Sequence, residues 1–257
     1  MVKGQNDGLK NEDAMILSLN NKTFSELNDN LKDFLRFLTN DQIEASTKIS
    51  CEKVTGGSEL KPDINIIIEG KNYYVSIKKE GGGHSVHEEN LEEFILYLKS
   101  LGNLTLELEE NLKRYIWADG TLDGSGDPHK RIGREFKTKH PEICENISKL
   151  FNDPKYKYLL LERFLFLGKN PNLPSAEFIY LGNPSKGLYA TKEEVMDLVT
   201  DPLNRSRSAA VPLGPLTVQA RGKKREKNRG KIQLKWGNLT KNFTDIKKVS
   251  NHYFKLD

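Results

Sequence analysis

The chain is poor in the residues and segments that define several common protein classes. Only two of its 257 residues are cysteines, Cys51 and Cys144, which is too few for a disulfide framework. We therefore expect a reducing, cytoplasmic environment in which both thiols pack as small apolar side chains. No run of 18 or more apolar residues occurs, so no transmembrane helix is expected. Residues 1–10 also lack the apolar stretch of a signal peptide.

Motifs for several cofactors and metals are missing as well. The triple glycine at residues 81–83 is not followed by the Gly-Lys-Ser/Thr of a phosphate-binding P-loop. The histidines and cysteines have no spacing typical of a zinc site. Asp119, Asp123 and Asp127 do not fit the spacing of a calcium loop, and we expect turns in this segment instead.

The charge distribution is uneven. The net charge is only +4, yet the segment from Arg221 to Lys235 contains eight lysines or arginines and a single acid, Glu226. This segment carries +7, so the rest of the chain carries −3. A basic block on a slightly acidic body favours a polyanionic partner, and a solvated charged loop is the alternative.

Hydrophobic periodicity predicts an α/β protein. Apolar residues recur at helical spacing in four segments, at residues 9–19, 27–38, 141–151 and 155–167. Short runs typical of strands occur at residues 48–55, 63–68, 72–79, 115–118, 177–181, 187–190, 216–221 and 231–236. Two more helices are predicted from capping patterns, one over residues 85–100 with Ser85 and Glu88 as a capping box, and one from Thr191 with Glu194 as capping partner.

The two strands at residues 63–68 and 72–79 are expected to form a hairpin around Glu69-Gly70-Lys71. Ser76 and Lys78 lie two residues apart on the second strand and therefore share one face. Asp63 stands at the start of the partner strand, so the hairpin can bring all three side chains to one end of the sheet. A carboxylate there can hold a divalent cation, and an ammonium group can stabilise charge on a phosphate.

Pro62-Asp63 followed by Ser76-Ile77-Lys78 resembles the motif of the PD-(D/E)xK nucleases, the group that contains many type II restriction endonucleases. The resemblance covers roughly residues 9–100. It implies a restriction-endonuclease-like mixed central β-sheet flanked by helices, Mg²⁺ as the cofactor and double-stranded DNA as the substrate. A cognate DNA methyltransferase is implied as a partner by the resemblance alone.

The sequence departs from the family pattern at Ser76, where a second acidic residue usually stands. A serine cannot supply the missing negative charge for a hard cation. Some restriction endonucleases also have a serine here and place the glutamate on the following helix. The resemblance therefore favours Glu88 or Glu89, near the start of the predicted 85–100 helix, as the second metal ligand. For Glu88 the alternative is a capping role.

Two further residues are candidates for the site. Glu12 lies on the apolar face of the first predicted helix, and related nucleases often use an acidic residue from an early helix, so the resemblance implies a supporting contact to metal or water. The alternative is an exposed charge favoured by the helix dipole. His87 would lie on the inner side of its predicted helix and could contact the scissile phosphate, or it could be a packed histidine.

The basic segment is predicted to form a second hairpin that recognises DNA. Its strands bury one apolar side and present the other side outward, with Thr217, Gln219, Arg221, Lys231, Gln233 and Lys235. These residue types read base edges, and a two-stranded ribbon fits the major groove. The intervening loop would lie along phosphates through Lys223, Lys224, Arg225 and Arg229. A surface hairpin with a solvated basic tip is the alternative.

The sequence thus predicts a Mg²⁺-dependent, sequence-specific DNA endonuclease. In this hypothesis Asp63 and a helix glutamate hold the metal, Lys78 orients water or neutralises the transition state, and Ser76 hydrogen-bonds around them. A nuclease core at residues 1–115 would precede a recognition region at 116–257, or the two would form one continuous domain. A branch-specific repair or junction nuclease, an inactive DNA-binding protein, an RNA-directed nuclease and a homodimer all stay open.

Overall fold

The computed structural model describes residues 7–56, 59–81, 84–102, 104–132, 135–170, 172–206, 210–220 and 228–253. The chain divides into two compact units, and each is discontinuous in sequence. Unit 1 comprises Met1–Gly82, Glu162–Leu198 and Asn238–Asp257, and unit 2 comprises Gly83–Leu161 and Val199–Gly237. These limits do not coincide with a boundary after residue 115. No helix in the described ranges is long and apolar enough to cross a bilayer.

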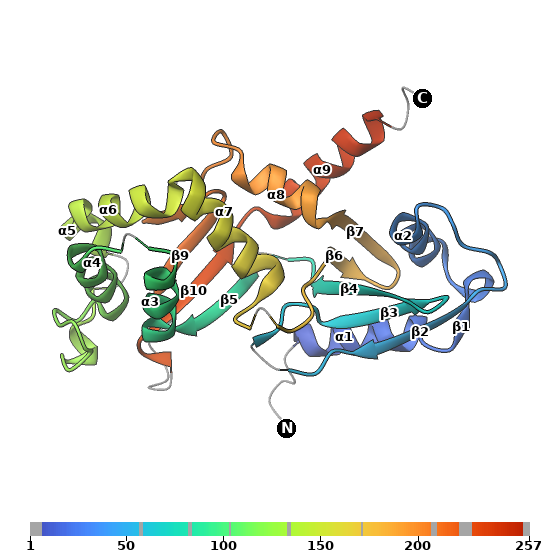
Figure 1. Ribbon diagram of the computed structural model, residues 1–257, viewed down its shortest axis with the longest axis horizontal. Helices are drawn as coiled ribbons and strands as arrows, with labels where there is room; N and C mark the ends of the chain where they lie inside the picture. Colours follow the sequence, from blue (N-terminus) through green and yellow to red (C-terminus); the bar gives the residue numbers. More distant parts are fainter. Residues whose placement is uncertain are drawn as a thin grey trace. The chain divides into compact units, whose positions relative to one another are not determined.

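Unit 1 is built on a mixed six-stranded sheet in the order β1-β2-β3-β4-β6-β7 (Figure 1). The strands are β1 (Lys22–Thr23), β2 (Lys48–Lys53), β3 (Ile64–Ile68), β4 (Lys71–Lys78), β6 (Phe178–Asn183) and β7 (Lys186–Thr191). Neighbouring strands are antiparallel except for β4 and β6, which are parallel and pair Val75 with Phe178. The α/β class predicted from the sequence is confirmed.

Helices cover this sheet because their apolar stripes match its buried residues. They are α1 (Asp7–Leu19), α2 (Asp29–Thr39), α8 (Lys192–Thr200) and α9 (Leu239–Tyr253), with the short turns η1 (Phe24–Glu26) and η5 (Arg163–Leu167). Figure 1 shows α1 running along the β2-β3-β4 meander. Met15 and Leu19 of α1 and Phe34 of α2 belong to one buried cluster with Ile66 and Val75 of the sheet. This packing fixes the N-terminal helix beside the ends of β2, β3 and β4.

The predicted hairpin forms as β3 and β4, although its turn is one residue shorter than expected because Lys71 already belongs to β4. Its turn has two central residues, Glu69 with φ 51° and Gly70 with φ 80°. Positive φ at both positions is the type I′ geometry, whose twist matches that of antiparallel strands. The turn sets the register in which Ile64 pairs with Val75. That register in turn decides which β4 side chains lie next to the start of β3.

Unit 2 contains an antiparallel four-stranded sheet in the order β5-β10-β9-β8. The strands are β5 (His84–Asn90), β8 (Val211–Leu213), β9 (Leu216–Ala220) and β10 (Lys231–Trp236). The helices are α3 (Leu91–Ser100), α4 (Leu106–Trp117), η3 (Pro128–Lys130), α5 (Phe136–Lys139), α6 (Pro141–Asn152) and α7 (Pro154–Glu162). The apolar faces of β9 and β10 are buried, including Val218, Leu234 and Trp236. Tyr115 of α4 donates a hydrogen bond to the Val218 carbonyl at 2.7 Å.

Two predictions about unit 2 are wrong. Residues 84–90 form strand β5, and the helix begins only at Leu91, so Ser85 and Glu88 form no capping box. The predicted strand at 115–118 is the end of helix α4, which Thr105 caps by accepting a hydrogen bond from the Leu108 N–H. By contrast, the predicted capping box of α8 is confirmed, since Thr191 and Glu194 bond each other's backbone N–H groups at 2.9 and 3.2 Å.

Candidate active site

Asp63 is held at the point where β3 begins between its two neighbours. Its N–H donates to the Val75 carbonyl at 2.9 Å, and its carbonyl accepts from the Val54 N–H at 3.1 Å. Pro62 precedes it and fixes the backbone that enters the strand. Asp63 is therefore tied to β4 on one side and to the end of β2 on the other. Its carboxylate lies where three strands begin or end.

Three donors converge on one oxygen of the Asp63 carboxylate. The Ile77 N–H, the Ser76 hydroxyl and the Lys78 ammonium donate to Oδ2 at 2.6, 3.1 and 3.3 Å. Hydrogen bonds in which one partner is charged are stronger than those between neutral groups. Because all three contacts go to Oδ2, none of them uses Oδ1. The predicted convergence of Asp63, Ser76 and Lys78 at one end of the sheet is confirmed.

Lys78 is oriented by three acceptors. Its Nζ donates to Ser76 Oγ at 2.7 Å and to the Ile77 carbonyl at 3.1 Å, in addition to Asp63 Oδ2. An ammonium group has three hydrogens, so these contacts account for its donor capacity. The Lys78 side chain is 22% exposed, which leaves it accessible from solvent. Ser76 is almost fully buried and connects the lysine to the carboxylate.

A second carboxylate and a second lysine lie beside this cluster. Glu12 Oε2 of α1 and Lys53 Nζ of β2 are 3.0 Å apart, and Asp13 Oδ1 is 3.7 Å from the same Nζ. Burial raises the pKa of Glu12 above its usual value, and the negative charge of Asp63 raises it further. The hydrogen bond and charge of Lys53, and the charge of Lys78, oppose this rise. Glu12 is therefore electrostatically part of the same cluster as Asp63.

The donor set can be compared with the requirements of a magnesium ion. Glu12 and Asp63 supply carboxylate oxygens and Ser76 a hydroxyl oxygen, all of them hard ligands. Within the ranges that the structure describes, no three His, Cys, Asp or Glu side chains form a group able to hold a metal. Magnesium typically binds through one or two protein carboxylates and keeps several waters or substrate phosphate oxygens. The carboxylates of Glu12 and Asp63 fit that mode of binding, in which water or substrate supplies the remaining ligands.

The two glutamates proposed to complete the site lie in unit 2 and are engaged there. Glu88 Oε1 is 3.5 Å from Lys231 Nζ of the adjacent strand. Glu89 hydrogen-bonds to His87, and both side chains are essentially buried. Both glutamates belong to strand β5, so the prediction that one of them projects from a helix is wrong. His87 pairs across from Leu234 and shares its buried side, and it offers no accessible ring nitrogen to a phosphate in this structure.

The predicted C-terminal hairpin exists, although it is not a two-stranded ribbon. β9 and β10 pair antiparallel, with Gln219 opposite Gln233 and Thr217 opposite Lys235. β10 also pairs with β5, so it is an interior strand of a four-stranded sheet. In the described sheet β9 and β10 both have neighbours on each side, so they cannot enter a DNA groove as a two-stranded ribbon. DNA recognition by this sheet would have to use its polar face.

The polar face of that sheet contains a chain of side-chain hydrogen bonds. Gln219 Nε2 donates to Gln233 Oε1 at 3.2 Å, and Gln233 Nε2 donates to Ser85 Oγ at 2.9 Å. Gln233 is buried, so the prediction that it is presented outward is wrong. Thr217, Gln219, Lys231 and Lys235 on this face are partly exposed. Arg221, Lys223, Lys224 and Arg225 of the predicted recognition loop lie outside the described residues.

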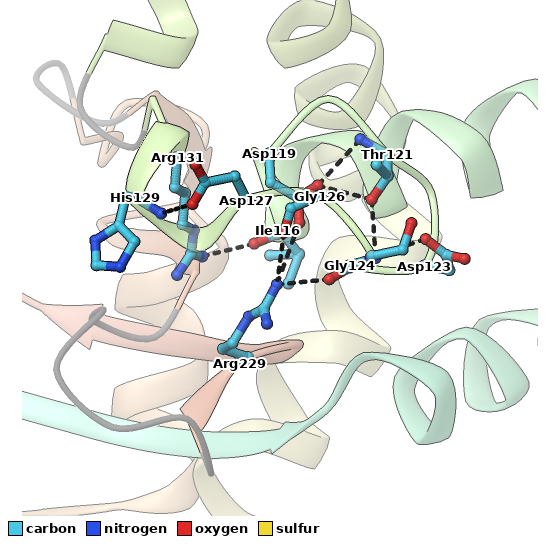
Figure 2. Close-up of polar contacts among 11 residues, drawn as sticks. Ile116, Asp119, Thr121, Asp123, Gly124, Gly126, Asp127, His129, Arg131 and Arg229 are labelled. Atoms are coloured by element: carbon cyan, nitrogen blue, oxygen red, sulfur yellow. Dashed lines mark hydrogen bonds and ion pairs between the residues drawn. The ribbon is translucent and has the colours of Figure 1, made fainter.

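Arg229 is engaged inside unit 2. Its Nη2 donates to the carbonyls of Gly124 and Gly126 at 2.5 and 3.4 Å and lies 3.4 Å from Asp119 Oδ2 (Figure 2). The guanidinium carbon is also 5.9 Å from the ring centroid of Trp117. These contacts link the end of the basic segment to the loop after α4. Arg229 therefore has a structural role here that the sequence prediction of a phosphate contact did not include.

The loop itself is organised by turn chemistry, as the sequence predicts. Asp119 Oδ1 accepts hydrogen bonds from the Thr121 N–H and hydroxyl at 3.0 and 2.8 Å (Figure 2). Asp123 and Asp127 accept from the N–H groups two residues later, at 3.0 and 2.9 Å. Each is an Asx-type turn in which a short acidic side chain replaces a backbone acceptor. Arg131 joins the loop to α4 by donating to the Ile116 carbonyl at 2.6 Å.

Sequence reasoning missed Lys53 and Asp13. Strand β2 was predicted over residues 48–55, but its register against β3 was not. That register pairs Lys53 with Ile64, next to Asp63. Asp13 adjoins Glu12 on α1, and only the packing of α1 beside β2 brings either residue to Lys53. The signal that could have identified Lys53 is its position at the end of the strand that precedes Asp63.

Comparison with known proteins adds no family to this description. The chain matches no model of a protein family, and no curated protein matches it.

Proposed function

We propose that the protein is a Mg²⁺-dependent endonuclease that hydrolyses phosphodiester bonds in double-stranded DNA, with a core of the restriction-endonuclease type. The observation that carries the proposal is the hydrogen-bonded group of Asp63, Ser76 and Lys78, with Glu12 beside it. The strand arrangement in unit 1 supports it: an antiparallel meander, β1 to β4, is followed in the sheet by β6, which is parallel to β4, and the cluster lies at one end of β3 and β4.

Each residue of the cluster would have its own role in phosphodiester hydrolysis. Asp63, through Oδ1, and Glu12 would hold the metal, which when bound acidifies a water and offsets charge on the phosphate. Lys78 lies against the same carboxylate and would exchange one of its three present acceptors for the attacking water or a phosphate oxygen. Ser76 keeps the lysine in place through its 2.7 Å hydrogen bond. The Ile77 N–H holds Asp63 in one orientation at 2.6 Å.

The sheet of unit 2 supplies the proposed DNA-reading surface. Its polar face offers amide and ammonium groups, and glutamine and lysine are among the side chains that read base edges in the major groove. The hydrogen bonds of Gln233 to Gln219 and Ser85 order these amides before any DNA is bound. Ordered side chains lose less conformational entropy on binding than free ones. The basic segment that joins β9 and β10 would add contacts to phosphates.

A second proposal is that the protein binds DNA without cleaving it. One reason is Ser76, which provides no charge where nucleases of this type place a carboxylate. The other is that Lys53 and Lys78 already neutralise Glu12 and Asp63. In this case the cluster of Asp63, Ser76 and Lys78 would serve only to stabilise the end of the sheet.

The deciding experiment is incubation of the purified protein with supercoiled plasmid and Mg²⁺, with an EDTA control. Discrete linear fragments are expected for a sequence-specific endonuclease. Asp63→Asn should abolish them, while Lys71→Met should not, because Lys71 lies at the end of β4 opposite Lys78 and contacts Tyr73. Binding without nicking under any divalent cation would reject the nuclease and support the second proposal. If the protein cleaves only branched DNA, or only RNA, the proposed substrate must be changed accordingly.

A further inference from the structure

Each of the two proposed metal-ligand carboxylates is paired with a lysine, and Asp13 adds a third carboxylate on the outer side of Lys53. Glu12 pairs with Lys53 at 3.0 Å and Asp63 with Lys78 at 3.3 Å. The four charges sum to zero, whereas a site for a divalent cation normally carries net negative charge. A cation that approaches Glu12 and Asp63 therefore meets two ammonium groups already in contact with its ligands. Both ammonium groups repel the cation, so moving one of them away from its carboxylate would strengthen cation binding.

The two lysines differ in how firmly they are held. Lys78 donates to three acceptors, two of which belong to its own strand, and its side chain is 22% exposed. Lys53 has a 41% exposed side chain, and its described partners are the two carboxylates of α1. Lys53 is thus the ammonium group that can leave with less rearrangement, because a long exposed side chain exchanges rotamers readily.

An alternative partner for Lys53 is already present. Asp13 Oδ1 lies 3.7 Å from Lys53 Nζ, and the Asp13 side chain is 57% exposed, so it faces solvent beside the site. The Glu12 side chain is only 15% exposed. A small change in the rotamer of Lys53 would break its contact with the sheltered Glu12 and keep its contact with the outer Asp13. The charge of Lys53 would then stay paired while Glu12 became available.

We propose that Lys53 is an internal counterion that occupies Glu12 in the metal-free protein and transfers to Asp13 when a divalent cation binds. This inference rests on the proposed function, since it assumes that Glu12 and Asp63 form a metal site. It gives the protein a weak affinity for the metal alone. A DNA phosphate, which adds a negative charge to the site, raises that affinity, so metal and substrate bind cooperatively.

The proposal is tested by titrating DNA-free protein with Mn²⁺ and measuring free Mn²⁺ by electron paramagnetic resonance. The Asp63→Asn variant serves as the blank for ions bound elsewhere. Lys53→Met should bind Mn²⁺ at least about threefold more tightly than the parent, because the competing ion pair is gone. Lys53→Gln should change the affinity in the same direction. Lys48→Met, which removes an exposed lysine from the same strand, should match the parent.

A double-mutant cycle tests the role of Asp13 in the same titration. Asp13→Asn should weaken Mn²⁺ binding in the parent background, because Lys53 then has only Glu12 as a partner. In the Lys53→Met background the same change should have a clearly smaller effect. Equal effects in the two backgrounds would reject the transfer to Asp13.

The outcomes separate this inference from the proposed function. If the parent binds more Mn²⁺ than Asp63→Asn, but Lys53→Met binds no more tightly than the parent, the counterion proposal is wrong and the metal site stands. If the parent, Lys53→Met and Asp63→Asn all bind Mn²⁺ equally, the metal site does not exist and both proposals fall together.

Discussion

Ser76 accepts a hydrogen bond from the Lys78 ammonium at 2.7 Å, from a position two residues earlier on the same strand. Its hydroxyl hydrogen is donated in turn to Asp63 Oδ2 at 3.1 Å. A single buried hydroxyl thus connects the cation and the anion of the cluster. A glutamate at this position would attract Lys78 by charge, whereas the serine positions it by hydrogen bonding alone.

Ser76→Ala should therefore disturb the cluster without disturbing the fold. The change removes one acceptor from Lys78 and one donor to Asp63, and we expect a loss of about 1–2 kcal/mol in the free energy of unfolding. DNA cleavage should fall by at least about tenfold, because Lys78 loses its fixed orientation. Urea denaturation and plasmid cleavage measure the two effects. A variant as stable and as active as the parent would show that the hydroxyl has no positioning role.

Lys78→Met keeps the aliphatic part of the side chain and removes its charge. Cleavage should fall by at least about 100-fold, because the transition state loses its main ammonium donor. DNA binding, measured with Ca²⁺ in place of Mg²⁺, should change little. The control is Lys71→Met on the same strand, which should cleave like the parent. Parental cleavage by Lys78→Met would remove this lysine from the mechanism.

The raised pKa of Glu12 predicts a pH-dependent change in stability. Burial raises this pKa in the folded protein above its unfolded value, so the folded state favours the protonated acid. The contribution of Glu12 to stability is therefore fully present below the unfolded pKa and is lost as the pH rises through the folded pKa. Glu12→Gln should be more stable than the parent at pH 7, by about 0.5–1 kcal/mol, and this gain should disappear near pH 4.

Urea unfolding of both proteins at the two pH values tests this prediction. Lys53 lowers the gain at pH 7, because it loses part of its ion pairing when Glu12 becomes neutral. A Glu12→Gln variant that is less stable than the parent at pH 7 would mean that the ion pair outweighs the burial of the carboxylate. Loss of cleavage together with a gain in stability is the combination expected of an active-site acid.

Arg229→Met should destabilise unit 2. Asp119, whose side chain is 2% exposed, would lose its ion pair, and the carbonyls of Gly124 and Gly126 would lose their donor. We expect a loss of about 2–3 kcal/mol in the free energy of unfolding. Lys241→Met breaks an exposed pair with Asp245 within one helix and should change stability by less than about 0.5 kcal/mol. Similar small effects of both changes would show that the Arg229 contacts are not stabilising.

The polar sheet face can be tested through the salt dependence of DNA binding. Lys235→Met should weaken binding and lower the slope of log K against log salt by about 0.9, as expected for the loss of one phosphate contact. Gln219→Ala should instead reduce discrimination between DNA sequences, because an amide reads base edges. An unchanged slope for Lys235→Met together with unchanged specificity for Gln219→Ala would exclude this face from DNA recognition.

The core of the candidate site was predictable because its geometry is local. Asp63, Ser76 and Lys78 belong to one hairpin, and a two-residue turn with period-two alternation fixes their register. Glu12 was chosen from the family resemblance, and its role as a supporting contact to metal or water stays a prediction, although the charge of Asp63 acts on it in the structure. Lys53 was not predictable, because its place depends on the register between β2 and β3 and on how α1 packs.

Strand β5 was misassigned for a physical reason. Residues 84–90 carry a capping-like pattern and precede a true amphipathic helix, so local signals favour extending that helix toward Ser85. The strand conformation is decided by pairing with β10, which lies far away in the sequence. Local propensity cannot detect such a partner. The same limit applies to the two units, because no compositional linker marks where the chain passes from one to the other.

The parallel pairing of β4 with β6 has a consequence for how the protein is made. Val75 reaches its neighbour only when Phe178 has been synthesised, and unit 2 is likewise completed only by β8, β9 and β10. A nascent chain therefore exposes unpaired strand edges until these later strands have been synthesised, and such pairing between distant segments favours slow folding. Truncation after residue 115 would leave β4 without β6, so a fragment of residues 1–115 should not keep the Asp63, Ser76 and Lys78 cluster folded.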